Sequence, residues 1–176
     1  MKGVGKIATT GIWKIEKRLD NVIDYTTNIE KTINSDYCKD SYYDLHNVID
    51  YVEADYKTEK QFYVSGVNCN PKTALEEMTI TKEQYGKTGG ILGFHAFQSF
   101  AEGEVTPEQC HAIGVRLAEE MWGDRFEVVV STHLNTNHYH NHFVINSVSF
   151  KDGKRYYDKR ETYAELRRLS DGVSIK

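Results

Sequence analysis

The chain has 176 residues, enough for one domain with a hydrophobic core. Its formal net charge of −4 disfavours a protein that coats nucleic acid regardless of sequence, although a local groove can still be positive. No apolar run is long enough to cross a membrane and no secretory signal begins the chain, so we expect a cytoplasmic protein without membrane insertion. The three cysteines form no CxxC pair, so we expect neither a disulfide framework nor a cysteine metal site.

The chain has only two prolines and no low-complexity tract, so we predict a single domain without a linker over residues 1–176. The expected elements, in chain order, are a strand over 5–15, helices over 19–32 and 45–60, a strand over 61–69, a helix over 70–87, a strand over 89–100, a helix over 105–123, strands over 125–133 and 142–150, and a last helix from about Asp158.

The clearest of these is the helix over 105–123. Thr106 is a suitable N-cap, Pro107 stands at the first helical position, and Gln109 completes a capping box. Gly123 can end the helix. The two strands that follow are joined by too few residues for a crossover helix, so they should be antiparallel. The predicted fold class is therefore α+β, a central antiparallel sheet flanked by helices.

Four of the seven histidines fall within HLNTNHYHNHF, residues 133–143. In a strand, His138, His140 and His142 would share one face, and a hairpin would bring His133 beside His140 and His142. Three imidazoles with open positions suit a catalytic metal, whereas four ligands would close a structural zinc site. Accidental clustering of surface histidines is the third interpretation.

Two of the twelve tyrosines occupy matching places in similar helical segments, Tyr25 in VIDYTTN and Tyr51 in VIDYVEA. A phenol attacks poorly at its ordinary pKa of about 10. Beside a metal-bound phosphate it can lose its proton and form a covalent ester. A tyrosine on an early helix, followed by a strand of histidines, fits that chemistry.

The sequence resembles the conjugative relaxases, or mobilisation nucleases, of the HUH endonuclease superfamily, and is most similar to those of mobile elements in Gram-positive bacteria. IWKIEKRLDNVIDYTTNIEKT resembles the family's first motif, with its catalytic tyrosine at Tyr25. KTEKQFYVSGVNCNPKTALEEM, the long segment from GGILGFHAFQSF to VVVSTH, and HYHNHFVINSVSFKDGKRY resemble the blocks that follow. His133, His140 and His142 match its H-x6-H-x-H metal motif.

The resemblance implies an enzyme that nicks one strand of DNA at an origin of transfer. His133, His140 and His142 would bind Mg²⁺ or Mn²⁺, and Tyr25 would attack the phosphate and form a 5′-phosphotyrosyl intermediate. His95 would support catalysis from behind the metal or by handling a proton; its alternative is a satisfied core histidine. Single-stranded DNA, accessory relaxosome proteins and coupling proteins are the implied partners. We also expect the chain to be the N-terminal part of a longer protein.

Two features depart from the family pattern. Many relatives carry an acidic residue where this chain has Asn135, and residues 33–58 look like an insertion. The insertion makes Tyr51 a rival nucleophile and His46 a minor candidate. Other functions compatible with the motifs are a replication-initiator or transposase nuclease of the same superfamily, a metal-stabilised DNA-binding module without catalysis, and a small-molecule metallohydrolase.

Several further polar residues are candidates for supporting roles. We expect His138 to lie beside the metal ligands without being one, Asn146 to orient a ligand, and Gln98 and Ser99 to contact a phosphate or a base. Candidate phosphate contacts are the basic residues near the end of the chain: Lys154, Arg155, Arg160, Arg167 and Arg168.

Overall fold

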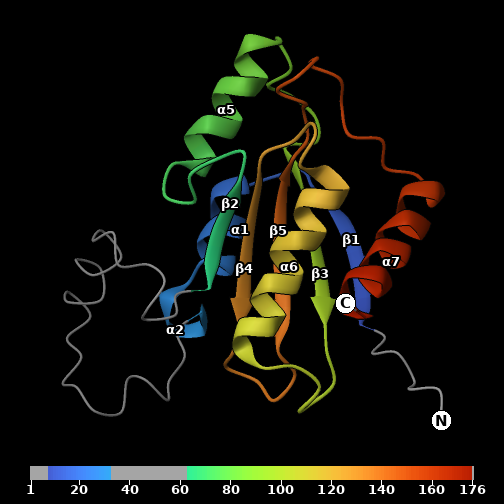
Figure 1. The fold of residues 1–176 in the computed structure, drawn as a ribbon. Coiled ribbons are helices and arrows are strands. Elements are labelled where there is room, and N and C mark those ends of the chain that lie inside the picture. The colour runs from blue at the N-terminus through green and yellow to red at the C-terminus, as the bar shows by residue number, and fades with distance from the viewer. Residues whose placement is uncertain (1–7, 33–62, 176) are drawn as a thin grey trace.

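The structure is a computed structural model that describes residues 8–32 and 63–175. The predicted helix over 45–60, together with Tyr51 and His46, lies outside the described residues. Within them, the elements follow the predicted order of strands and helices. They are β1 (Thr9–Ile15), α1 (Leu19–Thr26), α2 (Ile29–Thr32), β2 (Val64–Val67), α5 (Ala74–Gln84), β3 (Gly93–Ser99), α6 (Pro107–Trp122), β4 (Val128–His133), β5 (His140–Asn146) and α7 (Arg160–Ile175) (Figure 1).

The described strands form one sheet in the order β1-β3-β5-β4-β2, and every neighbouring pair is antiparallel. The α+β class and the antiparallel pairing of the last two strands are therefore confirmed. β5 lies at the centre of the sheet. Its middle residues, Phe143, Val144 and Ile145, are apolar, and the residues at its two ends are polar.

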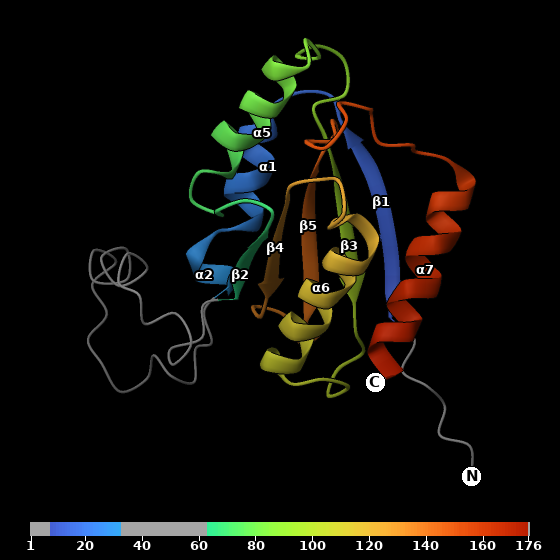
Figure 2. The ribbon, with the colours of Figure 1, turned by 45° about the horizontal axis from the view of Figure 1, so that its top comes forward.

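The two faces of the sheet are covered by different helices (Figures 1 and 2). We name the face under α6 and α7 the α6 face, where Phe143 and Ile145 pack with Leu117 and Trp122 of α6 and Leu166 of α7. We name the opposite face the α1 face. There the apolar core includes Val129 and Val144 of the strands, Leu19 and Ile23 of α1, and Met78 of α5. Because side chains alternate along a strand, consecutive residues of β4 and β5 serve different faces.

The cap predicted for α6 is present. The Thr106 hydroxyl accepts a hydrogen bond from the backbone N–H of Gln109, whose side chain accepts one from the N–H of Thr106. Gly114, in the middle of α6, lies against the amide of Asn141. A Cβ at this position would stand 2.5 Å from Asn141 Nδ2, so only glycine lets helix and strand approach this closely.

The single helix predicted over 19–32 is wrong, because the structure divides it into α1 and α2. At the end of α1 the hydroxyls of both Thr26 and Thr27 donate to the backbone carbonyl of Ile23. Such side-chain bonds compete with continued helical pairing and favour an end to the helix. The break leaves the last turn of α1 facing the end of β4.

Among the described residues, none of the helices has the length and apolar character of a membrane span.

Candidate metal centre

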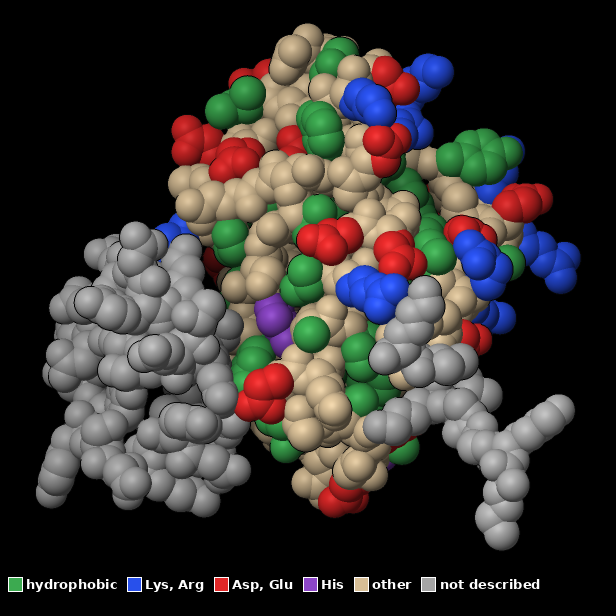
Figure 3. Space-filling view, viewed as in Figure 1, with side chains coloured by type: hydrophobic (Ala, Val, Ile, Leu, Met, Phe, Trp, Pro, Cys, Tyr) green, Lys and Arg blue, Asp and Glu red, His purple; other side chains and the backbone are tan. Residues whose placement is uncertain are grey.

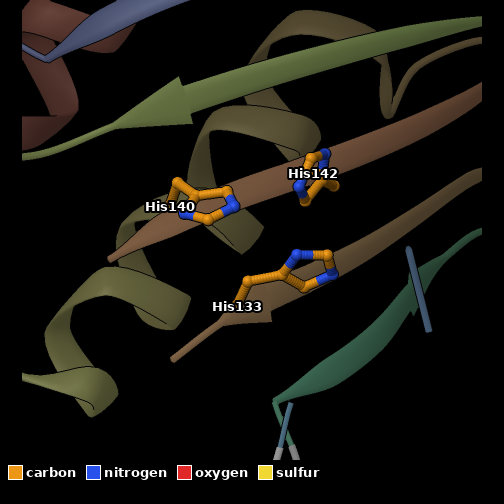
Figure 4. A group of neighbouring side chains, drawn as sticks. All are labelled: His133, His140 and His142. Atoms are coloured by element: carbon orange, nitrogen blue, oxygen red, sulfur yellow. The ribbon is translucent and has the colours of Figure 1, made fainter. Parts of the chain in front are cut away.

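His133, His140 and His142 come together on the α1 face, where β4 ends and β5 begins (Figure 4). His133 stands directly opposite His140 in the antiparallel register, and His142 follows two residues along the same face. Their ring centroids are 4.2 to 5.1 Å apart, and one nitrogen from each ring lies within 4.8 Å of the others. The strand alternation expected from the sequence therefore produces three converging imidazoles.

Hydrogen bonds at the outer nitrogens fix the tautomers of two rings. His133 Nε2 is 2.9 Å from the carbonyl oxygen of Thr26, and His140 Nδ1 is 2.9 Å from the carbonyl oxygen of His138. A carbonyl can only accept, so both of these nitrogens carry the proton. Nδ1 of His133 and Nε2 of His140 are thereby left with free lone pairs.

The third ring offers the clearest sign of a missing ligand. Nε2 of His142 is buried and has no hydrogen-bond partner among the described residues. Its other nitrogen, Nδ1, is 2.7 Å from Nε2 of His95. An unpaired buried nitrogen is costly unless something binds it. Three converging imidazoles fit a divalent cation, with coordination positions left over for a substrate.

Two of the three rings, His133 and His142, are held neutral, as metal ligation requires. Burial lowers the pKa of His133 to about 4. For His142, burial and then the neighbouring His133 lower the pKa to about 2. At neutral pH both rings therefore present lone pairs rather than positive charge.

His95 lies on β3 behind His142. It is 9% exposed, its ring centroid is 4.9 Å from that of His142, and burial lowers its pKa to about 4. If His142 uses Nε2 for a cation, its Nδ1 must carry the proton and donate it to Nε2 of His95. His95 thus contacts a metal-ligand candidate rather than the open side of the site.

Tyr25 reaches the open side from the last turn of α1. Its side chain is 53% exposed, and its ring centroid is 5.8 Å from that of His133 and 6.1 Å from that of His142. The ammonium of Lys31, on α2, lies 3.4 Å from the centre of the Tyr25 ring. Neither Lys31 nor the Thr26 carbonyl was among the site residues predicted from the sequence. The only signal for them was their place in the same first motif as Tyr25.

Two of the supporting roles expected from the sequence are wrong. Gln98 is fully buried on the α6 face, where its amide donates to Ser170 and accepts from Asn141, so it cannot contact DNA. Asn146 does share a strand face with the histidines, but its amide donates to the Met78 carbonyl and to Glu127. These partners lie at the far end of β5.

His138 and Ser99 lie close to the three histidines. His138 supports His140 through its backbone carbonyl, while its own ring contacts the carbonyl oxygen of Phe100. Ser99 is opposite His140 in the sheet register and is half-buried on the α1 face. Asn135 is exposed in the loop between β4 and β5.

The basic residues near the end of the chain lie apart from the histidines. Arg155 donates to the carbonyl oxygens of Gly89 and Ile91, beyond the far end of β5. Arg160, Arg167 and Arg168 belong to α7, on the α6 face. The side of the molecule with α6 in front shows acidic and basic side chains interspersed rather than a continuous basic surface (Figure 3). These arginines therefore do not lie where a phosphate beside Tyr25 would be.

Comparison with known proteins places this geometry in a family. The model of the family described as "Relaxase: MobA/VirD2-like, nuclease domain" matches residues 51–176, which include all three histidines. Two proteins named "Protein rlx" from Staphylococcus aureus are 39% and 40% identical over 111 and 109 residues, 63% and 62% of this chain. The "Group II intron-interrupted relaxase LtrB" of Lactococcus lactis is 32% identical over 145 residues, 80% of this chain.

These alignments cover 33% and 34% of the two rlx proteins and 25% of LtrB, so the chain spans about a third or less of these relatives. Tyr25 precedes the part of the chain that the family model matches. The match covers well over half of the chain and contains the histidine-bearing strands together with α5, α6 and α7. The chain therefore belongs to the family of MobA/VirD2-like relaxase nuclease domains.

Proposed function

We propose that this domain nicks one strand of DNA at an origin of transfer by transesterification, and that single-stranded DNA is its substrate. The observation that carries the proposal is the placing of an exposed phenol beside three converging imidazoles. A metallohydrolase for small molecules would need no tyrosine at this position. Membership of the relaxase family favours a relaxase over a replication initiator of the same superfamily.

His133 through Nδ1, and His140 and His142 through Nε2, would hold the divalent cation. Mg²⁺ or Mn²⁺ is the ion that the family resemblance favours, although three nitrogen ligands also suit zinc, cobalt or nickel. When bound, such an ion offsets negative charge on a non-bridging phosphate oxygen and fixes the phosphate in place. The unpaired Nε2 of His142 supports this assignment.

Tyr25 is the proposed nucleophile. Its phenolic oxygen forms a bond to the scissile phosphorus while the bond from phosphorus to the 3′ oxygen breaks. The phenol loses its proton and the leaving 3′ oxygen gains one to become a 3′-hydroxyl, while the 5′ end remains joined to the protein through a phosphotyrosine. Because one phosphodiester is exchanged for another, the strand can be rejoined by the reverse reaction.

Two neighbours support Tyr25 and His142 in these roles. Lys31 places a positive charge over the Tyr25 ring, close to where negative charge develops during attack on a phosphate. His95 is a positioning residue: by accepting a hydrogen bond from Nδ1 of His142, it directs the lone pair of Nε2 toward the cation. Accessory relaxosome proteins and coupling proteins are the proposed partners.

Formation of a covalent adduct tests the proposal. The protein is incubated with Mn²⁺ and a labelled single strand that contains the transfer origin of its own element, then denatured and separated by size. A labelled protein–DNA species should survive denaturation. Its absence, with Mn²⁺ and DNA both bound, would favour a DNA-binding module without catalysis.

Matched tyrosine variants identify the nucleophile. Tyr25→Phe should abolish the adduct while leaving DNA binding and Mn²⁺ binding within about twofold, because only the attacking oxygen is removed. Tyr51→Phe is the control and should form the adduct normally. The reverse result would assign the reaction to Tyr51.

A further inference from the structure

Trp13, on β1, has an exposed aromatic ring next to the proposed active site. Its side chain is 46% exposed, although it lies on the same sheet face as the three histidines. It stands directly opposite His95 in the sheet, with ring centroids 4.7 Å apart. Since His95 in turn contacts His142, the indole is two ring contacts away from a metal-ligand candidate.

The indole contacts two rings of β3, and no ring of the described residues is stacked parallel to it. Its neighbours are His95, at an interplanar angle of 66°, and Phe97, at 50° with centroids 5.7 Å apart. Gly11 makes room for this arrangement, because a Cβ at Gly11 would collide with the Phe97 ring. A glycine in a strand interior costs stability and often marks close packing of this kind.

An exposed tryptophan contributes little to folding compared with a buried one. The second tryptophan of the chain, Trp122, is 1% exposed and packs against Phe143 on the α6 face. Trp13 and Tyr25 instead lie on the two sides of the histidines, Trp13 beyond His95 and Tyr25 beside His133. A strand whose phosphate lies between Tyr25 and the histidines can therefore extend its next nucleotides toward Trp13.

We propose that Trp13 is a stacking platform for an unpaired nucleobase of the strand that the domain cleaves. This inference rests on the proposed function and adds a binding subsite to it. Bases of single strands stack on aromatic side chains because every base has a π-face, which gives affinity with little sequence preference. The net charge of −4 makes such a non-ionic contact valuable, since phosphate attraction by the whole surface is weak.

Tryptophan fluorescence tests the platform directly, because Trp13 is exposed and Trp122 is buried. The probes are a short oligodeoxythymidylate and an abasic oligomer of equal length, titrated at low salt without divalent cation so that no strand is cut. Thymidylate should quench the emission of the wild-type protein and of Trp122→Phe, and the abasic oligomer should not. Quenching that persists in Trp13→Leu would contradict the proposal.

Affinities separate stacking from phosphate contacts. Trp13→Leu should bind thymidylate about tenfold more weakly, and the abasic oligomer as well as the wild type does, because only the base contact is lost. Trp13→Phe keeps a ring and should recover most of the affinity. Tyr157→Leu, which changes a 57% exposed aromatic residue on the segment before α7, is the control and should bind both probes normally.

The outcomes distinguish this inference from the function on which it rests. If thymidylate binds, the covalent adduct forms, and Trp13→Leu changes neither affinity nor quenching, the platform is wrong and the nicking function stands. If the wild-type protein binds neither oligomer, the platform is wrong, and the adduct experiment with the origin strand decides the nicking function separately. Thermal unfolding of Trp13→Leu checks that the variant is folded, and the wild-type quenching experiment needs no variant.

Discussion

Both faces of the sheet carry buried histidines, but the hydrogen bonding of these histidines differs between the faces. On the α6 face a row of side chains runs from Ser65 through His111, Thr132, Asn141 and Gln98 to Ser170, and each member bonds to the next. On the α1 face there are two separate links, from the backbone carbonyl of Thr26 to His133 and from His95 to His142, and the second ends on a nitrogen without a partner among the described residues.

His111 and His142 illustrate the contrast between the two faces. Burial lowers the pKa of both, to about 4 and about 2, so a shifted pKa alone does not mark a functional site. Both ring nitrogens of His111 are hydrogen-bonded, to Ser65 and Thr132, whereas Nε2 of His142 is unpaired. Completed polar rows stabilise a fold, and the incomplete one points to an external ligand.

The largest expected effect is that of His142→Ala. Mn²⁺ affinity should fall by more than about a hundredfold and adduct formation should disappear, because one of three ligands is gone. The loss of stability should be modest, because the ring makes one side-chain hydrogen bond, to His95, while its other nitrogen is unpaired. Calorimetric titration with Mn²⁺ and urea unfolding measure the two quantities. Retained Mn²⁺ affinity would break the contrast between the two faces.

Asn141→Ala should give the opposite result. Its amide accepts from Thr132 and donates to Gln98 and to the Cys110 carbonyl, so its removal leaves several buried groups unpaired. The free energy of unfolding should fall by about 2–4 kcal/mol. In conditions where the variant is folded, Mn²⁺ affinity should stay within about threefold of the wild type. A stability near that of the wild type would show that the row contributes little.

His95 variants sharpen the assignment of the positioning role. His95→Leu removes the acceptor for His142 and should weaken Mn²⁺ binding by about 10- to 100-fold. His95→Gln keeps an acceptor oxygen and should recover part of that affinity. Equal losses in both variants, with equal losses of stability, would indicate that His95 only fills space in the core.

The smallest effect is a change in acid sensitivity through His111. Its pKa in the folded protein, about 4, is below its ordinary value of 6.5, so only the unfolded chain takes up a proton at intermediate pH. The contribution of this group is fully present above about pH 6.5 and is lost as the pH falls toward 4. His111→Gln should therefore lower the free energy of unfolding at pH 7. Below pH 6.5 that free energy should then fall less steeply with decreasing pH than in the wild type, by up to the contribution of one proton. Urea unfolding between about pH 5 and pH 7 tests this; an unchanged pH dependence would contradict it.

The sequence allowed the features set by local periodicity to be predicted. The cap of α6, the antiparallel pair of last strands and the shared face of His140 and His142 all follow from patterns within a few residues. Asn146 has the same alternation as these histidines, but its partners come from α5 and from the residue before β4, so periodicity could not assign its role. The role predicted for Gln98 was wrong for the same reason, because its hydrogen-bond partners lie on β5 and α7.

Exposure was equally hidden from the sequence. Trp13 stands in an apolar strand where a buried ring would be the ordinary expectation, and only the assembled sheet leaves it half open beside His95. Lys31 meets Tyr25 because the helix breaks after Thr26, and that break depends on hydroxyl bonds to the Ile23 carbonyl.

Thr26, whose carbonyl oxygen bonds to His133, is the residue that follows Tyr25, so one hydrogen bond links the proposed nucleophile to a proposed metal ligand. Withdrawal of the phenol from the site would strain or break this bond and disturb the imidazole that it orients. After cleavage, the same tether would keep the captured 5′ end close to the place where it was severed. Fidelity of resealing would then depend as much on one main-chain oxygen as on any catalytic side chain.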